Sequence, residues 1–168
     1  MRITSYPAEE SDVAFDFSAA IWCDRHDVTN TASQGVDFII EEPDRQIWLE
    51  VKNWHGVSVL PHRRGGQAKS FLAKLRGKQK KTFFKEVMRG KFISTVAYFA
   101  LQQSPLTKPI LYVALLESSR MDAHILSTST TELRSLVRAG KWAVPVEAIV
   151  VNLAEWQVRF PEYPAHAV

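Results

Sequence analysis

The sequence predicts an α/β domain in which helices flank a central mixed β-sheet. Apolar runs of strand length occur at 36–41, 46–52, 110–116 and 146–153, and segments with helical apolar spacing precede or separate them. The run 110–116 contains no charged residue, which is typical of a strand buried on both faces. Strands that alternate with helices in this way favour a sheet covered by helices.

Residues 9–23 are expected to form the first helix. Val13, Phe17 and Ile21 recur at intervals of four and would make one apolar stripe. Acidic residues in the first turn suit the positive end of a helix dipole. A polar segment, 24–35, follows and contains turn-forming residues.

The next two strands, 36–41 and 46–52, are expected to pair as a hairpin. Pro43 lies between them, and proline presets the backbone of a turn. In the second strand the odd positions are aliphatic and should face one way, whereas the even positions should face the other way.

After a loop at 53–66, residues 67–103 are expected to be mainly helical, with breaks near Gly77 and Gly90. The strand at 110–116 then follows Pro109, which ends the helical region.

A short helix is expected at 130–139, after a loop at 127–131. Thr130 or Thr131 is a plausible N-cap, and Gly140 closes the helix. The strand at 146–153 completes the core.

Length and composition fit one domain over residues 1–168, with its core at about 9–153 and a loose tail at 154–168. The chain has 168 residues, of which 46% are apolar and 23% charged. Its single cysteine, Cys23, excludes an intramolecular disulfide and is expected to be buried. With no signal-peptide pattern and no apolar run long enough to span a bilayer, the expected location is the cytoplasm, without a membrane partner.

The segment 63–91 is strongly basic. It holds one acidic residue, Glu86, against eleven basic residues: Arg63, Arg64, Lys69, Lys74, Arg76, Lys78, Lys80, Lys81, Lys85, Arg89 and Lys91. Such one-sided charge predicts a surface for a polyanion, although a solvated helix face would look similar. The residues expected to contact nucleic acid are Arg63, Arg64, Lys69, Lys74, Lys78, Gln79, Lys80 and Lys81.

Asp37, Glu50 and Lys52 form the candidate catalytic group. Period-two geometry places Glu50 and Lys52 on one face of their strand, and the hairpin can bring Asp37 beside them. Mg²⁺ or Mn²⁺ takes one or two carboxylates, and the carbonyl of Val51 is a further possible ligand. A bound metal lowers the pKa of water, and a lysine can position that water or stabilise a charged transition state. The alternative is a cross-strand salt-bridge ladder, but Trp48 shares this face, which favours a covered site.

The order of helix, hairpin, D-x12-E-x-K, helix and strand resembles the PD-(D/E)XK nuclease superfamily. The resemblance covers residues 9–117 and implies a restriction-endonuclease-like three-layer sandwich. It implies that Asp37 and Glu50 are metal ligands and that Lys52 is the catalytic lysine. Val36 stands where the superfamily motif has proline, and the chain lacks the cysteines of iron–sulfur branches.

The resemblance also implies an acidic residue on the first helix. Glu10 is the best match to this catalytic position, with Glu9 and Asp16 as rivals. Some branches add a glutamine or lysine from the next helix, for which the candidates are Gln79, Lys80 and Gln67.

These observations predict a divalent-metal-dependent endonuclease that hydrolyses phosphodiester bonds. DNA is favoured over RNA because of the resemblance, and a role in defence or DNA repair would fit. A chain this small has little room for a sequence-reading module, so a homodimer or a subunit of a larger complex is expected. The alternatives are a noncatalytic nucleic-acid-binding or assembly subunit on the same fold, and a toxin-like RNase.

Overall fold

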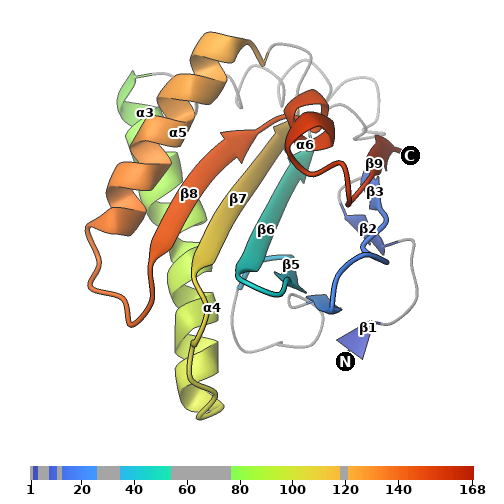
Figure 1. Cartoon of the computed structure of the whole chain (residues 1–168). Coiled ribbons are helices and arrows are strands. Elements are labelled where there is room, and N and C mark those ends of the chain that lie inside the picture. Colours follow the sequence, from blue (N-terminus) through green and yellow to red (C-terminus); the bar gives the residue numbers. More distant parts are fainter. Residues whose placement is uncertain (1, 4–7, 11–12, 26–34, 54–76, 118–120) are drawn as a thin grey trace, which may run out of the picture.

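The computed structural model describes the chain outside residues 1, 4–7, 11–12, 26–34, 54–76 and 118–120. Its centre is a six-stranded sheet in the order β1-β4-β5-β6-β7-β8 (Figure 1). The strands are β1 (Arg2–Ile3), β4 (Trp22–Arg25), β5 (Phe38–Glu41), β6 (Gln46–Asn53), β7 (Ile110–Glu117) and β8 (Val146–Val151). The pairs from β1 to β6 are antiparallel and those from β6 to β8 are parallel. The predicted mixed sheet is therefore confirmed.

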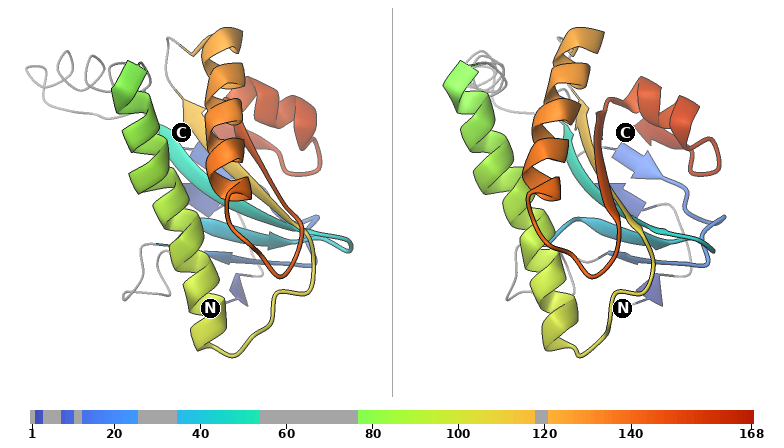
Figure 2. Two further views of the ribbon diagram at one scale, coloured as in Figure 1. Left: turned by 90° about the vertical axis from the view of Figure 1, so that its left-hand side faces the viewer. Right: turned by 60° about the vertical axis from the view of Figure 1, so that its left-hand side comes forward.

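One face of the sheet is covered by two long helical segments. The first runs through α3 (Gly77–Thr82), the π-helical turn η1 (Phe83–Met88) and α4 (Arg89–Leu101), and the second is α5 (Ala123–Arg138). Both lie on the same side of the sheet in Figure 2. Trp48, Phe92, Tyr112 and Leu133 are fully buried in the core between the sheet and these helices.

The opposite face is covered by a helix and a second sheet. The helix is α6 (Leu153–Arg159), and the sheet has the order β2-β3-β9, from β2 (Ala8–Glu10), β3 (Val13–Phe15) and β9 (Ala165–Ala167). The second core contains Phe15, Leu49, Val51 and Trp156. The sheet thus has a packed layer on each face (Figure 2).

The predicted helix at 9–23 is wrong. Val13 and Phe15 alternate with smaller or polar neighbours, and this segment forms β3, between β2 and β9. Asp16 then makes a turn, in which the Ser18 N–H donates to Asp16 Oδ1 at 2.8 Å. The apolar residues fit either period, and pairing with β9, from the far end of the chain, stabilises the strand instead of the helix.

The predicted hairpin is confirmed. β5 and β6 are antiparallel with Phe38 opposite Leu49, and the Glu42 N–H donates to the Arg45 carbonyl across the turn at 2.9 Å. The odd positions of β6 pack in the core beside α6, whereas Trp48 packs in the core beside α4. The hairpin strand begins at Phe38, so Val36 and Asp37 lie just before it.

The helix from Gly77 to Leu101 continues through Gly90, where a break was expected. Gly90 lies inside α4, and an added Cβ would meet no atom within 4 Å. The irregularity is instead the π-helical turn η1, where the wider winding accommodates the buried side chains of Phe84 and Met88. The expected loop and helix start at 54–76 lie outside the described residues.

Helix α5 begins at Ala123 instead of Thr130, so the predicted loop at 127–131 is wrong. Its N-cap is Asp122, whose Oδ1 accepts from the Ile125 N–H at 2.8 Å. Inside the helix the Thr131 hydroxyl donates to the Ser127 carbonyl at 3.1 Å. Such backbone bonding allows hydroxyl residues within a helix, although their propensity alone favours caps and turns. The predicted end, just before Gly140, is confirmed.

Residues 154–168 are not a loose tail. Trp156, Phe160, Tyr163 and Ala165 are buried in the second core, and β9 pairs with β3. Pro161 and Pro164 interrupt the apolar pattern between α6 and β9, so the local pattern alone does not indicate this packing. The core therefore extends to the C-terminal strand.

Cys23 is buried in β4, as expected. Among the described helices, none has the length and apolar character needed to cross a membrane.

Candidate functional site

Asp37 and Glu50 are brought together by the β5–β6 hairpin. The Val51 N–H donates to Asp37 Oδ2 at 2.7 Å, which ties the residue before β5 to the centre of β6. Both carboxylates are buried, and Asp37 and Glu50 are 3% and 0% exposed. Burial of two acidic side chains is costly unless compensating groups are near.

Two lysines supply that compensation. Lys52 Nζ lies 2.5 Å from Glu50 Oε1 and donates to the Val51 carbonyl at 3.1 Å. Lys91 Nζ, from α4, lies 3.6 Å from Glu50 Oε1 and 4.0 Å from Asp37 Oδ1. The side chains of Lys52 and Lys91 remain 28% and 20% exposed, so the charged cluster reaches the surface.

Thr95 fixes the position of α4 against the segment that carries Asp37. Its hydroxyl accepts from the Val36 N–H at 2.9 Å and donates to the Lys91 carbonyl at 3.0 Å. Thr95 is fully buried. One hydroxyl thus connects the residue before Asp37 with the helical turn that carries Lys91.

Burial dominates the electrostatics of Glu50. Loss of solvent raises the pKa of the Glu50 carboxyl, and the positive charges of Lys52 and Lys91 oppose this shift only in part. The second oxygen, Oε2, is buried and accepts no hydrogen bond in the part of the chain that the structure describes. A carboxylate held in this way is suited to bind a cation.

The donor set fits a hard divalent cation. Asp37 and Glu50 offer two carboxylates, and the Val51 carbonyl lies close enough to hydrogen-bond with the Lys52 ammonium beside Glu50. Magnesium usually takes one or two carboxylates and completes its shell with water or phosphate oxygens. The described residues contain no group of three or more histidine, cysteine or acidic side chains placed to hold a metal.

Burial of Tyr112 beneath this site gives a pH-dependent prediction. Burial, together with the negative charges of Glu50 and Asp37, raises the pKa of the Tyr112 hydroxyl well above its ordinary value. Above about pH 10 the unfolded state releases this proton first, so folding stability falls as pH rises. In Tyr112→Phe we expect a shallower alkaline fall, measured by urea unfolding between about pH 9 and pH 11.

The same substitution removes a hydrogen bond. The Tyr112 hydroxyl donates to the Met88 carbonyl at 2.8 Å, so at neutral pH the variant should lose about 1–3 kcal/mol of stability. Equal pH slopes in wild type and variant would contradict the assignment of the alkaline effect to Tyr112.

The structure removes the basis on which Glu10 was chosen. Glu9 and Glu10 lie in β2, and Asp16 lies in an exposed turn, so no first helix carries these three residues. The sheet that contains β2 packs, through Val13 and Phe15 of β3, on the face opposite to Glu50. The position of Glu10 therefore no longer supports a catalytic role for this residue.

The structure describes two of the three candidates for a further site residue from the helix after β6. Lys80 donates to Thr128 Oγ1 at 2.7 Å and so bridges α3 to α5, and burial lowers the pKa of its ammonium group. Gln79 lies in α3, and Gln67 lies outside the described residues. Among the described lysines of the helical segment after β6, Lys91 is the one that lies beside the carboxylates.

The predicted nucleic-acid contacts are described only in part. Arg63, Arg64, Lys69 and Lys74 lie outside the described residues. Lys78 lies in α3, and Lys81, at the end of that helix, is exposed. Lys85, one turn further along, is also exposed. Two exposed lysines thus precede Lys91 on one continuous helical segment.

Sequence reasoning missed Lys91 and Thr95 as site residues. Lys91 was included in the basic segment as one more surface charge, although its side chain is only 20% exposed. Its neighbour Phe92 is fully buried, which places Lys91 at the edge of the core-facing side of α4. The helical spacing of Lys91 and Thr95 was the available signal, but the facing strand was needed to interpret it.

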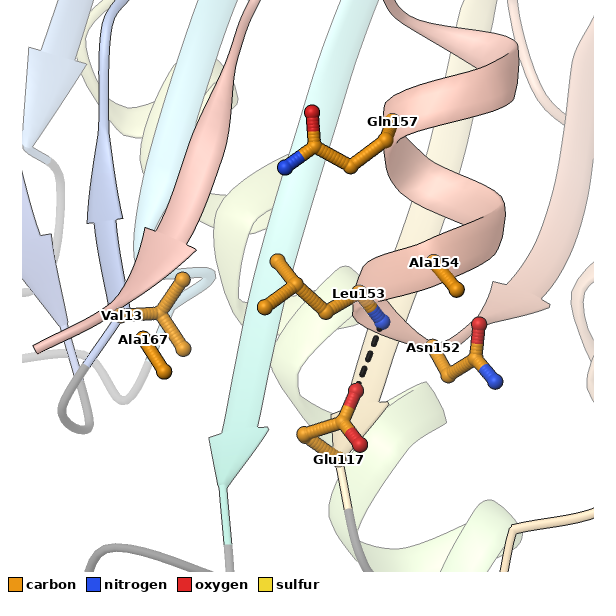
Figure 3. A pocket seen from close by; sticks show the side chains of 7 residues that line it. All are labelled: Val13, Glu117, Asn152, Leu153, Ala154, Gln157 and Ala167. Carbon is orange, nitrogen blue, oxygen red and sulfur yellow. Dashed lines mark hydrogen bonds between the residues drawn. The ribbon is translucent and has the colours of Figure 1, made fainter.

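A separate pocket lies on the other side of the sheet (Figure 3). It has a volume of about 470 Å³ and lies between the start of α6, the end of β7 and the strands β3 and β9. Its carboxylate, from Glu117, already accepts the Leu153 N–H at 2.7 Å. The other described residues that line it are aliphatic, apart from the amides Asn152 and Gln157.

Comparison of the chain with protein-family models, curated proteins and solved structures gives no match. The resemblance to the PD-(D/E)XK superfamily and the restriction-endonuclease-like fold therefore stay predictions.

Proposed function

We propose that the protein is a divalent-metal-dependent nuclease that hydrolyses phosphodiester bonds at the Asp37–Glu50 site. The observation that carries the proposal is the pair of buried carboxylates with two lysine ammonium groups beside them. The motif and the order of the hairpin, helix and parallel strand support a restriction-endonuclease-like fold. That resemblance also favours DNA as the substrate.

Asp37, Glu50 and the Val51 carbonyl would hold Mg²⁺ or Mn²⁺. A metal held there would activate water and neutralise charge on the phosphate. The hydrogen bond from the Val51 N–H to Asp37 Oδ2 leaves Oδ1 on the side of Lys91. Because the hairpin fixes both carboxylates, little reorganisation is needed to present them to a cation.

We assign to Lys52 the role of stabilising the reacting phosphate. Its ammonium group pairs with Glu50, and 28% of its side chain is exposed. Lys52 therefore lies between the carboxylates that would bind the metal and the solvent. A positive charge in this position stabilises the charge that develops on phosphate oxygens. Lys81 in α3 and Lys85 in η1 are exposed and would bind phosphates of the nucleic-acid backbone. The affinity of such contacts depends on salt concentration.

Cleavage assays with the purified protein test this proposal. Linear, circular and branched DNA, and RNA, are incubated with Mg²⁺, Mn²⁺ or EDTA. We expect cleavage that EDTA abolishes, and a loss of about 100-fold or more in the rate for Lys52→Gln. Lys141→Gln, at an exposed position outside the basic segment, is the charge-matched control.

The substrate panel also separates the alternatives. Salt-sensitive binding with no cleavage under any metal would contradict the proposal and favour a noncatalytic binding or assembly subunit. Cleavage of RNA alone would retain the metal site and point to a ribonuclease.

A further inference from the structure

We propose that Lys91 is a tethered cation that occupies the space between Asp37 and Glu50 in the metal-free protein and weakens metal binding there. The inference rests on the proposed function and adds a regulatory property to the same site. Lys91 Nζ lies within 4.0 Å of one oxygen of each carboxylate. A divalent cation held by both carboxylates would bind Asp37 through Oδ1, because Oδ2 accepts the Val51 N–H, and Oδ1 is the oxygen that this ammonium group faces.

Lys52 reaches the site from the strand that carries Glu50. Its Nζ lies 2.5 Å from Glu50 Oε1 and donates to the carbonyl of its neighbour Val51 at 3.1 Å, and both partners lie on β6. Lys91 comes from a different element, α4, and approaches one oxygen of each carboxylate. Its charge compensates the acidic pair when no metal does so.

The hydrogen bonds of Thr95 determine how the Lys91 ammonium group can move away from the carboxylates. The Lys91 carbonyl accepts the Thr95 hydroxyl, and the same hydroxyl accepts the Val36 N–H, so the backbone of this turn is fixed. Release must therefore come from rotation of the four-carbon side chain, which is 20% exposed and has a path to solvent. Metal binding then exchanges one cation for another without a shift of α4.

This exchange has two consequences. Removal of the Lys91 charge should tighten metal binding, because the metal no longer has to displace a competing cation. The same removal should lower the stability of the metal-free protein, because among the described residues Lys52 alone would remain as an ammonium partner of the buried Glu50 carboxylate. Opposite effects on affinity and on metal-free stability would distinguish a displaced cation from a simple structural ion pair.

Calorimetric titration of the metal-free protein with Mn²⁺ and with Mg²⁺, in the absence of nucleic acid, tests the proposal. In Lys91→Met, which keeps the aliphatic volume, we expect the dissociation constant to fall about 10-fold or more. Lys91→Arg, which keeps the charge, should bind as weakly as wild type. Lys141→Met is the control for loss of an exposed positive charge and should show the wild-type affinity.

Thermal unfolding provides the second readout. The midpoint should be lower for metal-free Lys91→Met than for wild type, and excess Mn²⁺ should raise it by more in the variant. If Lys91→Met does not fold, Lys91→Gln replaces it in both measurements.

The outcomes separate this inference from the proposed function. If Asp37→Asn abolishes metal binding while Lys91→Met and Lys91→Gln bind as wild type does, the role of Lys91 is wrong and the metal site stands. If neither wild type nor the Lys91 variants bind Mn²⁺ or Mg²⁺, both proposals are wrong.

Discussion

Glu50→Gln is expected to abolish metal-dependent cleavage and leave the fold intact. The amide has the shape of the carboxylate but lacks the charge that would hold a divalent cation in this buried position. Metal stabilisation of phosphate charge contributes several kcal/mol, so the rate should fall by about 100- to 1,000-fold or more. Single-turnover cleavage with saturating protein measures this loss directly.

Stability of the Glu50→Gln variant provides a further check. Because burial raises the pKa of the Glu50 carboxyl, its charged form is disfavoured in the folded protein. The metal-free variant should therefore unfold at or above the wild-type temperature, and added Mn²⁺ should no longer stabilise it. Glu147→Gln, at an exposed position of β8 paired with Arg134 and Arg138, is the matched control and should cleave normally.

Two results would contradict this assignment. Full cleavage by Glu50→Gln would exclude Glu50 as a required ligand. A variant that unfolds at much lower temperature would instead show that the carboxylate mainly stabilises the fold through Lys52 and Lys91.

Trp156→Ala is expected to cause the largest loss of stability. Trp156 is fully buried, and its ring lies 4.5 Å from the Phe160 ring and 5.7 Å from the Phe15 ring, centroid to centroid. Its indole N–H donates to the Tyr163 carbonyl at 2.7 Å. Truncation leaves a large cavity and an unpaired carbonyl, for a cost of about 3–5 kcal/mol. Urea unfolding at neutral pH measures this change.

A control on the same helix isolates the effect of burial. Val158 is 80% exposed, so Val158→Ala should change stability by less than about 0.5 kcal/mol. Equal and small effects of the two substitutions would mean that residues 154–168 pack weakly, contrary to the structure.

The hairpin shows how much of the site was predictable from the sequence. Strict alternation in β6 placed Glu50 on the face opposite to Leu49 and Val51, and the turn at Pro43 set the pairing with β5. Local periodicity was sufficient because both strands are neighbours in the chain. The meeting of Asp37 with Glu50 therefore followed from short-range information.

The N-terminal segment shows where the same reasoning fails. Val13, Phe15 and Phe17 fit a strand, whereas Val13, Phe17 and Ile21 fit a helix. Pairing of β3 with β9, at the other end of the chain, selects the strand over the helix. Pairing over such a distance has no local signature, and the error carried over to Glu10.

The sequence alone determined the strand–turn–strand unit, the faces of β6 and the candidate acidic pair, because these depend on the two-residue period of a strand. Only the tertiary structure decided that Lys91 faces the carboxylates, that Thr95 ties α4 to Val36, and that the C-terminal segment completes the core. The physical reason is that helix-to-sheet packing and strand pairing join residues far apart in the chain. Which side of α4 faces Glu50 is set by the packed sheet and not by the charge of Lys91 itself.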